Sequence, residues 1–135
     1  MNKLALIAVV GLVGCSESDK SENVGRPVRT LSQTASLFYE AAENSDTATL
    51  FAVTTPSTAA RMRQYPIRND TAIRTFTVLN ERLAEGMENQ GFVSGIETTK
   101  DRRTGEVLRV DTVRWELYQE QGEWRAAAAV PTSNN

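Results

Sequence analysis

The stretch YQEQGEWRAAAAV, residues 118–130, decides the fold because it joins a tight turn to a segment of alternating side chains. Gly122 supplies the backbone freedom that a short turn requires. After the turn, apolar side chains recur at every second position from Trp124 to Val130, which is the period of a β-strand with one buried face. The sequence therefore predicts that the chain closes with an antiparallel hairpin.

Two further strands are predicted before this hairpin, over residues 92–98 and 106–118. The segment KDRRTGE between them has the composition of a turn, with Gly105 at the position of unusual backbone angle. Within the second strand the apolar phase changes near Asp111 and Thr112, which predicts a β-bulge or a strong bend. We expect a curved antiparallel sheet of about three strands.

Helices are predicted before the strands. Over residues 28–42, apolar side chains recur at intervals of three and four, which is one face of a helix. Ser45 or Asp46 is suited to cap a short second helix, because a side-chain oxygen there accepts from free backbone N–H groups, and Pro56 ends it. Residues 57–65 form a candidate third helix.

The longest predicted helix runs over residues 71–89. Ile73, Phe76 and Leu83 mark its buried stripe. Asp70 is suited to cap its start, and Gly91 is suited to end it. Helices followed by strands predict an α+β domain, with N-terminal helices packed on the curved sheet.

This order of elements resembles small lipoproteins of the nuclear-transport-factor-2-like superfamily, also called the cystatin-like cone. The resemblance rests on SLFYEAAENSDTATLFAVTTP at residues 36–56 and on YQEQGEWRAAA at residues 118–128. In such domains the final turn commonly has a glycine followed by a tryptophan and a basic residue, as do Gly122, Trp124 and Arg125 here. The resemblance covers about residues 30–130 and implies a cone-like domain.

Residues 1–14 have the pattern of an export signal. Lys3 is followed by LALIAVVGLV, a run without polar side chains that is too short for a bilayer span of about 20 residues. The following LVGC, from Leu12 to Cys15, resembles the lipobox of bacterial lipoproteins. That resemblance implies cleavage between Gly14 and Cys15, a diacylglyceryl group on the cysteine sulfur and an acylated new amino terminus.

The remaining organisation follows from this start. Residues 15–29 would be the lipidated cysteine and a flexible polar tether, residues 30–131 a single α+β domain, and residues 132–135 a disordered tail. Ser16 after the cysteine, by the family's sorting preference, implies the outer membrane, with the domain facing the periplasm. The expected partners are the lipid bilayer, through acylated Cys15, and other envelope proteins.

Composition narrows the chemistry. The 135 residues include no histidine and one cysteine, which excludes Ser–His and Cys–His pairs and an internal disulfide. A formal net charge of −2 disfavours nucleic-acid binding. Glu97, Asp101 and Glu106 bracket a turn but lack the spacing of a calcium loop, so we interpret them as surface acids. The sequence predicts no metal, no cofactor and no catalytic residue.

The arginines of the central segment are expected to be ordinary surface charge, with lipid phosphates or an anionic polysaccharide as alternative contacts. They are Arg61, Arg63, Arg68 and Arg74. We expect the two tryptophans of the predicted sheet to be core residues, with a place in a ligand cavity as the alternative. The candidate pocket residues all belong to that sheet and are Asp111, Trp115, Tyr118 and Trp124.

Some members of the resembled superfamily are isomerases or dehydratases with an Asp base and Tyr or Asp hydrogen-bond donors. On that resemblance Asp111 would be the base, with Tyr118 or Tyr39 beside it. We favour the other interpretation, in which Asp111 marks the bulge, faces solvent, or pairs with Arg109 or Arg114.

The favoured hypothesis is a non-enzymatic lipoprotein that acts as a binding or assembly module. A pocket-bearing enzyme and an accessory or exclusion lipoprotein of a secretion or conjugation apparatus remain as alternatives.

Overall fold

The structure is a computed structural model that describes residues 29–67 and 70–132. The predicted signal, the lipobox with Gly14 and Cys15, the tether up to residue 28, Arg68 and residues 133–135 lie outside the described residues. No helix among the described residues is long and apolar enough to cross a membrane. The elements are, in order, α2 (Leu31–Glu43), α3 (Thr47–Ala52), α4 (Pro56–Gln64), β1 (Ala72–Leu83), β2 (Gln90–Asp101), β3 (Val107–Glu120) and β4 (Glu123–Pro131).

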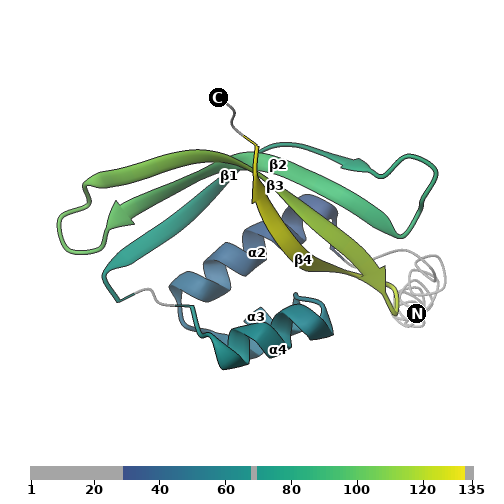
Figure 1. The fold of residues 1–135 in the computed structure, drawn as a ribbon, viewed down its shortest axis with the longest axis horizontal. Coiled ribbons are helices and arrows are strands. Elements are labelled where there is room, and N and C mark those ends of the chain that lie inside the picture. The colour runs from purple at the N-terminus through teal and green to yellow at the C-terminus, as the bar shows by residue number, and fades with distance from the viewer. Residues whose placement is uncertain (1–28, 68–69, 133–135) are drawn as a thin grey trace, which may run out of the picture.

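The four strands form one antiparallel sheet in the order β1-β2-β3-β4. The sheet curves over the helices, so that all three helices lie on its concave side (Figure 1). Helix α2 packs against β1 and β4, and α4 also contacts β4. The predicted α+β class, with helices on a curved antiparallel sheet, is confirmed.

The predicted helix over residues 71–89 is wrong, because most of this segment is strand β1. Its apolar residues satisfy both periods: Ile73 and Phe76 lie three apart, whereas Phe76 and Val78 lie two apart. β-Branched residues fill positions 71, 73, 75, 77 and 78, and such residues favour strands. The sheet therefore has four strands rather than about three, and Gly91 lies in β2 opposite Leu83.

The β-bulge predicted near Asp111 and Thr112 is also wrong. Both residues pair with β2 in unbroken register. The irregularities of β3 lie elsewhere: one opposite residues 99–100, and one against β4 at residues 116–117. The apolar phase changes because Val110 is an exposed residue of the outer face, whereas Val113 is buried on the inner face.

Each helix begins at a side chain that satisfies free backbone N–H groups. The Thr30 hydroxyl accepts from the backbone N–H of Gln33 at 3.0 Å, and the Gln33 side chain accepts from the backbone N–H of Thr30 at 2.9 Å. Asp46 caps α3, as predicted, and Thr55 caps α4. The three short helices are thus separated by capped turns, which lets the chain fold back beneath the sheet.

The hydrophobic core lies between α2 and the inner face of the sheet, where Phe38 packs on Trp115 at 4.8 Å between ring centroids. A second connection ties the α3–α4 segment to the sheet edge. The backbone N–H of Thr55 donates to the carbonyl of Ala126, and the N–H of Ala126 donates to the carbonyl of Val53. The helices and the sheet therefore share both a core and a backbone junction.

Candidate functional site

A cavity of about 210 Å³ lies between α2 and the inner face of the sheet. Its apolar wall includes Phe38, Ile73 and Trp115. Polar side chains reach it from both layers, since Tyr39 and Glu43 belong to α2 while Arg74 and Glu97 belong to β1 and β2. They are all part of the cavity wall.

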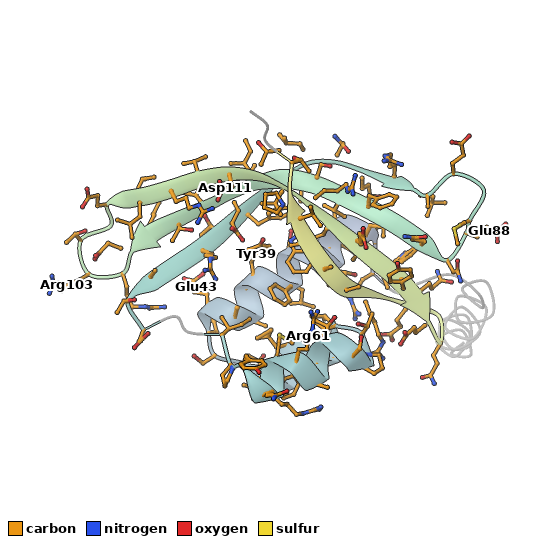
Figure 2. All side chains as sticks on the ribbon, in the orientation of Figure 1. Tyr39, Glu43, Arg61, Glu88, Arg103 and Asp111 are labelled. Atoms are coloured by element: carbon orange, nitrogen blue, oxygen red, sulfur yellow. The ribbon has the colours of Figure 1, made fainter. Side chains whose placement is uncertain are left out.

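A chain of two hydrogen bonds crosses from the sheet to α2 and back. The indole N–H of Trp115 donates to the hydroxyl oxygen of Tyr39 at 3.0 Å, and the Tyr39 hydroxyl donates to Oε2 of Glu97 at 2.7 Å. Figure 2 shows Tyr39 between α2 and the sheet. The three residues come from three different elements. The two hydrogen bonds therefore hold the Glu97 carboxylate in a fixed orientation at the cavity wall.

The pKa of Tyr39 is raised well above its usual value, chiefly because burial disfavours the charged phenolate. The hydrogen bond to Glu97 raises it further, and the bond from Trp115 acts in the opposite direction. The phenol consequently keeps its proton over the physiological pH range. It serves the site as a fixed hydrogen-bond donor.

The Phe76 ring of β1 stacks on the Tyr39 ring of α2. The two rings are nearly parallel, with centroids 4.8 Å apart and 2° between their planes. Phe76 can occupy this place because residue 95 is glycine: a Cβ there would lie 2.5 Å from Cζ of Phe76 and 2.5 Å from the carbonyl oxygen of Thr77. Gly95 thus leaves the space in which the site's aromatic pair is held.

The four residues predicted for a pocket lie in different places. Trp115 lines the cavity. Asp111 faces the same side of the sheet, but it forms an ion pair with Arg109 at 2.7 Å and is not part of the cavity wall. Tyr118 lies on the outer face, and Trp124 is buried in the core. The polar side chains of the cavity wall are therefore not the predicted ones but those of Tyr39, Glu43, Arg74 and Glu97.

The sequence predicts Glu97 to be a surface acid beside a turn, and its place in the cavity wall was not expected. The structure places it half-buried in β2, opposite Phe76 of β1 and Asp111 of β3. The alternation of β2 contained a usable signal: Glu97 shares its face with Val93, which is fully buried.

In the part of the chain that the structure describes, no cluster of three or more potential metal-ligating residues occurs.

No family model and no curated protein matches the sequence. Solved structures do match. A cystatin-like protein of unknown function from Nostoc punctiforme has a TM-score of 0.59 at 12% identity, over 75% of this chain and 86% of that chain. A ketosteroid isomerase-like protein from Erwinia carotovora atroseptica has a TM-score of 0.51 at 14% identity, over 77% and 95%.

The association domain of CaMKII from C. elegans also has a TM-score of 0.51, at 18% identity, over 87% of this chain and 98% of that chain. All three likenesses combine low identity with high coverage, so they concern the arrangement of the elements. They bear out the resemblance of the domain to the cystatin-like, nuclear-transport-factor-2-like fold.

Proposed function

We propose that this chain is a lipid-anchored lipoprotein of the bacterial envelope whose α+β domain binds a small molecule. The anchor is supported by the sequence LVGC, which ends at the single cysteine and follows a short apolar run. The fourteen residues between Cys15 and Thr30 span roughly 45 Å when extended, at about 3.3 Å each. A tether of that length would let the domain stand clear of the outer membrane and face the periplasm.

The binding role is carried by one observation, the hydrogen-bonded carboxylate of Glu97 at the wall of an otherwise largely apolar cavity. Glu97 offers hydrogen-bond acceptors, and Arg74 on the same wall offers donors. The volume of about 210 Å³ lies below the roughly 300–1,000 Å³ of drug-sized pockets. A small neutral ring that carries both a donor and an acceptor, such as a primary aromatic amide, suits these groups.

Because the Tyr39 phenol keeps its proton, we favour ligand binding over proton transfer as the role of the cavity. Its raised pKa makes the phenol a poor proton source near neutral pH, and its proton is already directed to Glu97. This arrangement suits orientation of a ligand rather than exchange of protons with it.

The enzyme alternative keeps one supporting observation, a carboxylate and a phenol side by side in a cavity beneath the sheet. If it holds, Glu97 rather than Asp111 would be the general base. A ketone in heavy water would then lose its α-protons to deuterium in the presence of the protein, and Glu97→Gln would abolish that exchange.

The experiment has one arm for the anchor and one for the cavity. In the first, cells producing the full-length chain are fed an alkyne-bearing fatty acid, and the label on the protein is measured for the wild type and for Cys15→Ala. We expect label on the wild type alone. An unlabelled wild type, or a label that persists without Cys15, contradicts the anchor.

In the second arm, benzamide is titrated against the full-length chain while tryptophan fluorescence is recorded, because Trp115 lines the cavity. We expect saturable binding that Glu97→Gln weakens about tenfold, as for loss of a charge-assisted hydrogen bond. Glu106→Gln, in the exposed turn before β3, is the matched control. Absence of saturation, or equal affinity of both variants, contradicts the binding role.

A further inference from the structure

A second cavity, of about 340 Å³, lies on the helical side of the domain. It is bounded by the end of α2, by α3 and α4, and by Pro66 and Ile67 after α4. It borders the cavity that contains Tyr39, because Ala42 and Ile67 belong to both walls. Its chemistry is different, since neither Glu97 nor Arg74 reaches it.

The wall of this second cavity is mainly apolar and suited to an aliphatic chain. Leu50 and Phe51 line it from α3, Met62 from α4, and Ile67 from the segment that follows. Flexible Met and branched Leu and Ile side chains adapt to an alkyl chain and offer it no hydrogen bonds. The volume is at the lower end of the roughly 300–1,000 Å³ that ligand pockets occupy, which fits one chain rather than two.

Arg63 is the charged residue on this wall. Its guanidinium carbon lies 4.4 Å from the centroid of the Phe51 ring. A guanidinium over an aromatic face is held there by cation–π attraction, and its N–H groups can still donate hydrogen bonds at the edges of the group. Those edge N–H groups are the ones that bind carboxylate or phosphate.

Among the residues that the structure describes, no neighbouring acid balances the charge of Arg63. Within residues 29–67 and 70–132, no carboxylate forms an ion pair with it. An uncompensated cation at the rim of an apolar cavity attracts an anion that carries an apolar tail, and it repels a cation with the same tail.

We propose that the cavity between α2, α3 and α4 binds a single-chain anionic amphiphile, with its alkyl chain against Leu50, Phe51 and Met62 and its anionic group on Arg63. This goes beyond the proposed function, because it concerns another cavity and another class of ligand. A free fatty acid and a monoacyl phospholipid share this chemistry, and the experiment separates these two sources.

The test uses the full-length chain carrying Cys15→Ala, so that no acyl group of its own takes part. Dodecanoate, lyso-phosphatidylglycerol and dodecyltrimethylammonium are each titrated by calorimetry below the concentrations at which they form micelles. We expect saturable binding of at least one of the two anions and binding of the cation at least about tenfold weaker. The preferred anion identifies the source. A cation that binds as tightly, or anions that do not bind, overturns the proposal.

A matched pair of variants locates the site. Arg63→Gln should weaken binding of the anion about tenfold, because one charge-assisted contact is lost. Arg61→Gln removes the same charge from the same helix at a residue outside the cavity wall, and it should leave the affinity unchanged. Both side chains are exposed, so neither change threatens folding. Equal effects of the two variants would place the binding elsewhere and refute the site.

Discussion

Tyr39 joins the helical layer to the sheet through both its ring and its hydroxyl. The ring stacks on Phe76, while the hydroxyl accepts from Trp115 and donates to Glu97. Burial makes these bonds important, because a buried polar group that loses its partner pays the full cost of desolvation. Removal of this one oxygen atom therefore affects three elements at once.

We predict that Tyr39→Phe destabilises the domain by about 1–3 kcal/mol while leaving the ring stack in place. The substitution leaves the indole N–H of Trp115 without its acceptor and Glu97 without its donor. Urea denaturation at neutral pH measures the change in the free energy of unfolding. Tyr65→Phe, at a residue that is 71% exposed, is the control and should have little effect.

The same pair of variants tests the pKa of Tyr39. The pKa of Tyr39 in the folded state is raised above its unfolded value of 10.0. The protonated phenol therefore contributes its full share to the free energy of unfolding below about pH 10, and this stabilisation is lost as the pH rises further. The wild type and Tyr65→Phe should lose stability above that pH, and Tyr39→Phe should lose less. Parallel alkaline curves for the three proteins would show that the phenol is not protected by burial.

At the scale of elements, the parts predictable from sequence were those with local causes. The hairpin around Gly122, the turn at Gly105 and the cap at Asp46 each follow from the conformational preferences of a few neighbouring residues. Strand β1 could not be distinguished in this way, because Ile73, Phe76 and Leu83 satisfy the helical period. Its pairing with β2, the strand that follows it in the chain, decides the outcome, and that pairing is not visible in the period of β1 alone.

The candidate site was predictable only in part for the same reason. Trp115 was among the candidate pocket residues, although a tryptophan in a small domain is more often a core residue. Glu97 was not, because its role depends on which face of β2 the helices cover and on Tyr39 arriving from α2. A local pattern identifies the alternation of a strand, whereas the cavity comes from the packing of layers.

Gly95 shows how one position in β2 controls the fit between two strands and α2. We predict that Gly95→Ala destabilises the domain by about 1–3 kcal/mol, because the new methyl group would overlap Phe76 and the carbonyl of Thr77. The displaced Phe76 ring would also disturb Tyr39, so benzamide binding should weaken in parallel. Urea denaturation and the benzamide titration give the two values. Ser94→Ala, at the preceding residue, is the control, and an equal effect there would contradict the steric explanation.

On the scale of the whole molecule, the helices and the sheet have little means of unfolding separately. The core that includes Phe38 and Trp115 spans both layers. Residues 53–55 also form backbone hydrogen bonds with Ala126 of β4. Thr58 adds a further bond from α4, donating its hydroxyl to the carbonyl of Ala127 at 2.7 Å. Small domains with one shared core usually unfold in a single cooperative transition.

The two tryptophans allow this cooperativity to be tested from two places in the core. Trp115 lies on β3 beside Phe38 of α2, and Trp124 lies on β4. In Trp115→Phe and in Trp124→Phe, we expect the fluorescence of the remaining tryptophan and the far-ultraviolet circular dichroism to change at the same urea concentration. The midpoints of the two variants will differ from each other, because each substitution changes the core differently. If the helical signal is lost at a lower urea concentration than the fluorescence of either tryptophan, α3 and α4 unfold as a separate unit, and their bonds to β4 do not couple the layers.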